Sequence, residues 1–154
     1  MGNQKEYVAS GGFTQYLYTH NEGDTIREGN LSAKVVYRKG TKDYHDSLPA
    51  HSNTSDMYFG MKHDSRTGEN RIDQLRFYKD RMAYMDFDWG HDHKVTSGPN
   101  KGKTYPKGTV HVQFFKIVNG HPVRDGSRIR MLSNAEIQKY GAFLRKADPN
   151  VKFR

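Results

Sequence analysis

The densest group of reactive side chains lies in the octapeptide DFDWGHDH, from Asp86 to His93. It holds three carboxylates and two histidines, and the segment GTVHVQFF adds a third histidine, His111. Imidazole has an unperturbed pKa of about 6.5, so it can donate or accept a proton near neutral pH. Carboxylates and imidazoles are also the metal ligands that remain to a chain without cysteine. The group is therefore a candidate functional site, and the alternative is a solvated polar turn at the end of a strand.

Two chemistries use such a set. In metal-free RNA cleavage, one histidine takes the proton of the 2′-hydroxyl, a second protonates the leaving oxygen, and a cation stabilises the phosphate. In metal-assisted hydrolysis, the carboxylates and histidines would hold a divalent ion. We expect the metal-free chemistry, with no cofactor, and keep a divalent metal as the alternative. The expected catalytic residues are three histidines, two aspartates and one arginine: His91, His93, His111, Asp86, Asp88 and Arg76.

Two strands of a hairpin are predicted at Arg71–Tyr78 and Met82–Trp89, on either side of the turn Lys79-Asp80-Arg81. Side chains alternate between the two faces of a strand. In the second strand, the alternation places the apolar side chains on one face and the two aspartates, Asp86 and Asp88, on the other.

A third strand is predicted over Thr109–Val118, where two polar side chains, His111 and Gln113, alternate with valines and phenylalanines. If this strand neighbours the one with the aspartates, the polar side chains of both share one surface, and the HDH loop forms its rim. Arg76 falls on the polar face of the hairpin, and we therefore expect it to contact the phosphate.

A helix is predicted over Ser133–Ala147. Ser133 is the expected N-cap, Glu136 completes a capping box three residues later, and Asp148-Pro149 ends the helix. Its apolar stripe needs a partner surface. The predicted fold class is therefore α+β: a mainly antiparallel sheet of four to six strands with this C-terminal helix packed on one face. We expect a single domain over residues 1–154, with 1–33 as an uncertain N-terminal extension of it.

The remaining elements are shorter. Strands are predicted at Lys34–Arg38 and Ser127–Met131, and Tyr7–Tyr18 fits either a helix or a strand. Segments rich in Gly, Pro, Asn, Asp and Ser are predicted as loops: Thr41–Asp56, Gly90–Lys107 and Val118–Gly126.

The composition limits the class of protein. The chain has 154 residues, no cysteine and a formal net charge of +8. No apolar run approaches the ~20 residues of a membrane span, and the start has no apolar stretch of a signal peptide, so we expect a cytoplasmic site of action. The absence of cysteine excludes a disulfide scaffold and thiolate chemistry.

The positive charge favours an anionic partner. Because the cations form no polybasic run, we expect no membrane partner. We expect nucleic acid as the anionic partner, and an acidic protein remains the alternative. The residues expected to contact nucleic acid are four lysines, an arginine and a tyrosine able to stack on bases: Lys94, Lys101, Lys103, Lys107, Arg128 and Tyr105.

Three segments carry a resemblance to a known class of domain. They read SLPAHSNTSDMYF from Ser47, RIDQLRFYKDRMAYMDFDWGHDH from Arg71 and YPKGTVHVQFF from Tyr105. Their order resembles that of C-terminal toxin-type domains of bacterial polymorphic toxins and prophage proteins, although HVQ stands here where those domains more often have a His-x-His pair. The resemblance implies a small effector encoded by a mobile element, commonly a nuclease and often one that cleaves RNA, so RNA is the favoured substrate. A cognate acidic immunity protein would neutralise it.

A rival hypothesis is a non-enzymatic protein of phage or mobile-element origin that binds nucleic acid or a nucleoprotein complex, such as an inhibitor of host defence. If the protein is an enzyme, replacement of one catalytic histidine should remove most of its activity. Binding distributed over many Lys and Arg should instead weaken gradually with salt.

Overall fold

The structure is a computed structural model that describes residues 3–8, 14–38, 48–64 and 68–154. In this part of the chain, the main sheet has seven strands, in the order β11-β10-β7-β6-β5-β4-β3. All neighbouring strands are antiparallel except β4 and β5, which are parallel. The strands are β3 (Thr25–Glu28), β4 (Leu31–Tyr37), β5 (Met57–Asp64), β6 (Glu69–Lys79), β7 (Met82–Asp88), β10 (His111–Val118) and β11 (His121–Met131). The mainly antiparallel sheet is confirmed, and its strand count exceeds the predicted four to six.

The predicted hairpin is formed by β6 and β7. Its two turn residues, Asp80 and Arg81, both have positive φ, at 51° and 68°. Positive φ at both central residues is typical of the type I′ turn, whose twist matches that of the flanking strands. Beyond the turn, an irregularity between Phe77 and Tyr78 shifts the register by one residue, and this shift places Arg76 of β6 opposite Asp86 of β7.

The loop predicted over Val118–Gly126 is wrong. β10 continues to Val118, β11 begins at His121, and only Asn119 and Gly120 turn between them, with φ of 50° and 78°. Farther from the turn the register shifts: Gln113 pairs with Ile129, whereas Phe114 pairs with Asp125. The three residues 126–128 therefore bulge out of β11, and the predicted strand Ser127–Met131 is only the end of a longer one.

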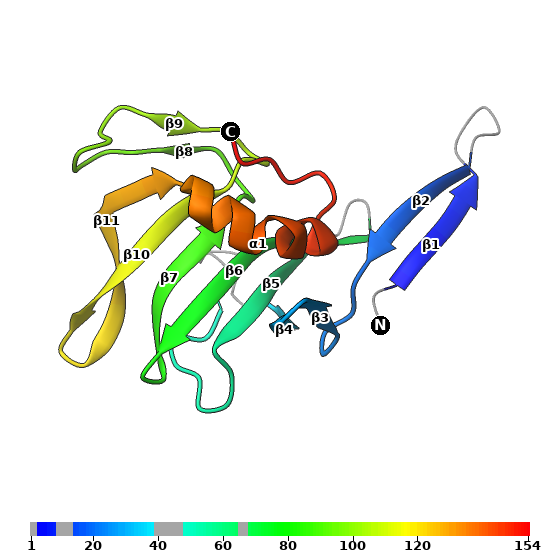
Figure 1. Cartoon of the computed structure of the whole chain (residues 1–154), viewed down its shortest axis with the longest axis horizontal. Coiled ribbons are helices and arrows are strands. Elements are labelled where there is room, and N and C mark those ends of the chain that lie inside the picture. Colours follow the sequence, from blue (N-terminus) through cyan, green and yellow to red (C-terminus); the bar gives the residue numbers. More distant parts are fainter. Residues whose placement is uncertain (1–2, 9–13, 39–47, 65–67) are drawn as a thin grey trace.

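One helix, α1 (Asn134–Ala147), covers one face of the sheet, as Figure 1 shows. The predicted capping box is present, because the Ser133 hydroxyl accepts from the Glu136 N–H and the Glu136 carboxylate accepts from the Ser133 N–H. Two such bonds satisfy N–H groups that the first turn of a helix leaves without partners.

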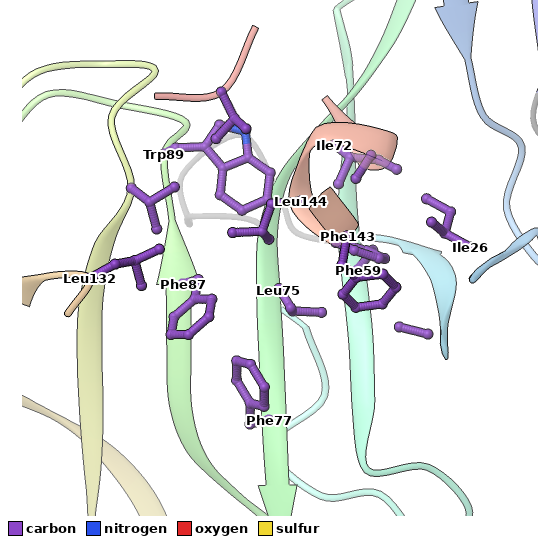
Figure 2. Close-up of a cluster of buried hydrophobic side chains, with 14 of the residues drawn as sticks. Ile26, Phe59, Ile72, Leu75, Phe77, Phe87, Trp89, Leu132, Phe143 and Leu144 are labelled. Atoms are coloured by element: carbon purple, nitrogen blue, oxygen red, sulfur yellow. The ribbon is translucent and has the colours of Figure 1, made fainter. Parts of the chain in front are cut away.

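The core lies between α1 and the sheet (Figure 2). Phe143 of the helix packs on Phe59, with ring centroids 4.9 Å apart, and Tyr140 packs on Phe87 at 5.4 Å. Directly after β7, the indole N–H of Trp89 donates at 3.0 Å to the carboxylate of Asp148, the residue whose backbone N–H caps the C-terminus of α1. The predicted packing of the helix on the apolar face is confirmed.

Two small sheets complete the described structure. β1 (Asn3–Val8) pairs with β2 (Thr14–Thr19), so the described parts of Tyr7–Tyr18 are strand. β8 (His93–Lys94) pairs with β9 (Thr104–Tyr105) inside the segment predicted as a loop. Of the loop predicted at Thr41–Asp56, residues 41–47 lie outside the described ranges, and 48–56 contribute one isolated bridge, from His51 to Met82. Among the described helical residues, none forms a helix long and apolar enough to cross a membrane.

Candidate functional site

The face of the sheet opposite α1 carries two rows of polar side chains. In the first row, His111 of β10 pairs with Asp88 of β7, which pairs with Gln74 of β6. Residues paired across neighbouring strands project to the same face. The predicted sharing of one face by these strands is therefore confirmed.

The second row consists of Gln113, Asp86 and Arg76, in the same strand order. The interpretation of this face as a solvated surface is wrong for both rows. All six side chains are buried, and Asp86 and His111 have no exposed surface.

Asp86 holds the second row together. Arg76 donates to both carboxylate oxygens of Asp86, at 2.7 and 2.9 Å, and to the Leu48 carbonyl at 2.6 Å. Gln74 and Arg124 contact one oxygen of the same carboxylate, at 2.8 and 3.1 Å. Burial alone would lower the pKa of Arg76, but the hydrogen bond and charge of Asp86 outweigh burial and raise it. Because its donors are engaged and the residue is buried, Arg76 is not free to meet a phosphate as predicted.

Three histidines converge at the end of the first row. His91 follows β7, His93 begins β8 and His111 begins β10. Their ring centroids are 5.6 Å (His91–His93), 5.5 Å (His91–His111) and 4.9 Å (His93–His111) apart. One nitrogen from each ring lies within 4.8 Å of one nitrogen of the other two. The structure thus brings together the three rings that the sequence grouped. Their catalytic use stays a prediction.

Asp88 orients the outermost ring of this cluster. Its Oδ1 lies 3.5 Å from Nδ1 of His91 and accepts from the Gly90 N–H at 3.2 Å. Nε2 of His91 lies on the other side of the ring, 3.4 Å from Nδ1 of His93. The side chain of His91 is 52% exposed, whereas that of Asp88 is 5% exposed. A buried carboxylate therefore sets the direction of a solvent-accessible imidazole.

His111 is the innermost ring. The Gln113 amide nitrogen lies 2.9 Å from its Nε2, and Arg124 donates to the Gln113 oxygen. An arginine has only donors, so the amide oxygen must face Arg124 and the amide N–H must face His111. Burial lowers the pKa of His111 to about 4; Asp88 opposes this effect, and His93 and His91 add to it. Burial also lowers the pKa of His93, assisted by His91. Both rings are therefore neutral near pH 7.

The expected nucleic-acid contacts differ in accessibility. Four predicted lysines and Arg128 are exposed on or near the β8–β9 segment and the bulge of β11: Lys94, Lys101, Lys103, Lys107 and Arg128. Arg128 also pairs with Asp125 at 2.8 Å. Tyr105 is buried, and its ring stacks on that of His111 with centroids 5.9 Å apart and an interplanar angle of 10°. Tyr105 therefore supports the histidine cluster and is not free to stack on a base.

A pocket of about 870 Å³ opens on the polar side of the sheet. Its lining includes Phe115 of β10, whose ring lies under the guanidinium groups of Arg76 and Arg124, at 4.9 and 5.5 Å. Arg124 also reaches the first row of side chains, because it bonds Gln113 and Gln113 bonds His111. The pocket and the histidine cluster thus share one hydrogen-bonded chain.

Sequence reasoning missed Arg124. The signal that would have found it is the dipeptide Asn119-Gly120, which is typical of a two-residue hairpin turn. If residues are paired outward from that two-residue turn, Arg124 lies opposite Phe115, as it does in the structure.

Comparison of the chain with protein-family models, with curated proteins and with solved structures finds no match in any of the three. The resemblance to toxin-type domains therefore stays a prediction, and we infer the function from geometry and charge.

Proposed function

We propose that this protein is a nuclease, with RNA as its favoured substrate, and that its reacting centre is formed by His91, His93 and His111. The observation that carries the proposal is the convergence of three imidazoles beside the buried carboxylate of Asp88 in a chain of net charge +8. Phosphodiester cleavage needs a group that takes the proton of the attacking hydroxyl, a group that gives a proton to the leaving oxygen, and a cation that stabilises the phosphate charge. Neutral imidazoles can supply the first, and we propose that His91 supplies the second and Arg124 the third.

The surroundings of the cluster suit a polyanion. Arg124 has a 43% exposed side chain, lines the pocket and is linked to His111 through Gln113. We propose that Arg124 takes the phosphate-binding role that the sequence had suggested for the buried Arg76. The exposed lysines of the β8–β9 segment, Lys101 and Lys103, would extend the contact to neighbouring phosphates.

The protonation states restrict what each histidine does. Since His93 and His111 are neutral near pH 7, each acts as a base or as a metal ligand and not as a proton donor. We assign the proton-donor role to His91, the most exposed of the three rings, whose Nδ1 lies 3.5 Å from the Asp88 carboxylate. An acidic partner protein that covers the basic surface would neutralise the activity.

The test is cleavage of labelled RNA and of plasmid DNA by the purified protein, with and without EDTA. Wild-type protein should cleave RNA, and His93→Ala should lower the rate by about 10²-fold or more. His121→Ala is the matched control, because His121 is an exposed histidine at the start of β11. Thermal unfolding of each variant shows whether the fold is kept. Wild-type protein that cleaves neither substrate, or His93→Ala that cleaves at the wild-type rate, contradicts the proposal.

A non-enzymatic binding function is the second candidate. It is favoured by the mutual pairing of Arg76 and Asp86, which removes two of the predicted catalytic groups from contact with a substrate. A binding protein should express freely without a partner and lose affinity gradually with salt, whereas a nuclease toxin should be hard to express alone.

A further inference from the structure

We propose that His91, His93 and His111 form a binding site for one divalent transition-metal ion of the zinc type, with Asp88 as the carboxylate that orients the site. This proposal does not depend on the proposed nuclease activity, because it rests on the arrangement of ligand atoms alone.

The first two ligands already have the spacing that such an ion requires. Zinc binds imidazole nitrogen at about 2.0–2.1 Å in a tetrahedron, which places two ligand nitrogens roughly 3.3–3.4 Å apart. Nε2 of His91 and Nδ1 of His93 are 3.4 Å apart. A direct N–H···N hydrogen bond would be shorter, at roughly 2.9–3.0 Å. The separation of these two nitrogens therefore matches two ligands of one ion better than a hydrogen-bonded pair.

Asp88 orients His91 as a metal ligand. Its carboxylate faces Nδ1 of His91 at 3.5 Å, which favours a proton on Nδ1 and leaves the lone pair on Nε2, directed toward His93. Metal-bound histidines usually donate their second N–H to a carboxylate or carbonyl in this way. Asp86 does not fit as a ligand, since Arg76, Arg124 and Gln74 already occupy its two oxygens.

His111 supplies the third nitrogen. Because its Nδ1 carries the proton, the ligand atom is Nε2, and the ion would replace the hydrogen bond that Nε2 accepts from Gln113. One nitrogen of each of the three rings lies within 4.8 Å of one nitrogen of the other two, so closure to about 3.4 Å requires a small movement of side chains. His111 is fully buried against Tyr105 and Gln113, whereas His91 is exposed and His93 is half-buried on the neighbouring loop. We therefore expect the two loop histidines to move toward His111.

Three protein nitrogens leave one position of a tetrahedron for water or a substrate oxygen, as in catalytic zinc sites, whereas structural sites are closed by four protein ligands. Arg124 bonds Gln113 beside His111 and so places a positive charge close to the cluster, which favours a negatively charged substrate. The site we propose is thus an open one.

The experiment is titration of EDTA-treated, dialysed protein with Zn²⁺ by calorimetry and with Co²⁺ by optical absorption. We expect one ion per chain and the intense visible bands of four-coordinate Co²⁺. His91→Ala and His93→Ala should each lower the affinity by at least about 100-fold, and Asp88→Asn by about 10–100-fold. His121→Ala should bind as the wild type does. Because His91 and His93 are not fully buried, their replacement should leave the fold intact, and circular dichroism checks this.

The absence of binding by folded wild-type protein, or binding that His91→Ala and His93→Ala leave unchanged, overturns the metal site. The experiments distinguish failure of the metal site from failure of the proposed nuclease activity. Zinc binding without any cleavage of RNA or DNA would remove the nuclease and keep the metal site. Cleavage that resists EDTA, by a protein that binds no Co²⁺, would remove the metal site and keep the nuclease.

Discussion

The Gln113 amide donates to Nε2 of His111 at 2.9 Å, and it does so because Arg124 occupies the amide oxygen. This relationship determines which nitrogen of a buried, neutral imidazole carries the lone pair. In that tautomer, Nε2 accepts and Nδ1 holds the proton, although Nδ1 has no hydrogen-bond partner among the described residues. An arginine outside the cluster therefore sets the chemistry of its innermost ring.

The first prediction reverses this relationship. In Gln113→Glu the carboxylate has no N–H to donate, so Nε2 of His111 should take the proton and donate to the new carboxylate. In this variant, the new carboxylate can still accept the hydrogen bond from Arg124. Two-dimensional ¹H–¹⁵N NMR of the histidine rings should show the Nδ1–H tautomer of His111 in the wild type and the Nε2–H tautomer in the variant. The ring of exposed His121 serves as the internal reference. An Nε2–H tautomer in the wild-type protein would refute the assignment.

The second prediction concerns the buried pair of Arg76 and Asp86. Arg76→Met removes the bidentate partner of a carboxylate with no exposed surface, and breaking a buried pair costs about 3–5 kcal/mol. Urea unfolding measures this loss. Arg128→Ala is the control, because the Arg128 side chain that pairs with Asp125 is half exposed, and such pairs contribute about 1 kcal/mol or less. Equal losses in the two variants would contradict the structural role of Arg76.

The third prediction concerns pH. Burial raises the pKa of Asp73 to about 6, although Arg38, 2.7 Å away, opposes the shift. The folded protein then holds this proton to about pH 6, whereas the unfolded chain releases it near pH 3.8. Between these values the folded state binds more protons, so the contribution of Asp73 to stability falls as pH rises.

The measurement is the difference in free energy of unfolding between wild type and Asp73→Asn, because the difference cancels the contributions of the histidines. It should decrease by roughly 1–3 kcal/mol in total from pH 4 to pH 6 and stay level outside this window. A difference that is constant from pH 4 to pH 6 would show that Asp73 ionises normally.

The fourth prediction concerns the basic surface. Replacement of Lys101 and Lys103 by Gln should weaken RNA binding about equally for all sequences, and the slope of log K against log salt should become shallower by about 2. Fluorescence anisotropy at several salt concentrations measures both. Lys139→Gln on α1 is the control, because α1 covers the opposite face of the sheet. An unchanged slope in the double variant would place the binding surface elsewhere.

The sequence predicted those parts of the site that follow from alternation. In β7 and β10 a period of two places Asp88 and His111 on one face, and the register pairs them. Alternation tells which face a side chain takes, but it does not tell what covers that face. Arg76 is buried partly by Leu48, whose carbonyl it meets across 28 positions of the chain. Such a contact leaves no local pattern, and for this reason the burial of this layer could not be predicted from the sequence.

The link between Trp89 and Asp148 gives the protein an intrinsic optical probe. Trp89 is the only tryptophan in the sequence. Its indole is buried between the end of β7 and the residue that caps α1, and it is two positions from His91. Tryptophan emission from the unlabelled chain therefore comes from one site, where the C-terminal end of the helix meets the start of the histidine loop. Quenching by a paramagnetic ion would report occupancy of that loop, and a red shift would report release of the helix.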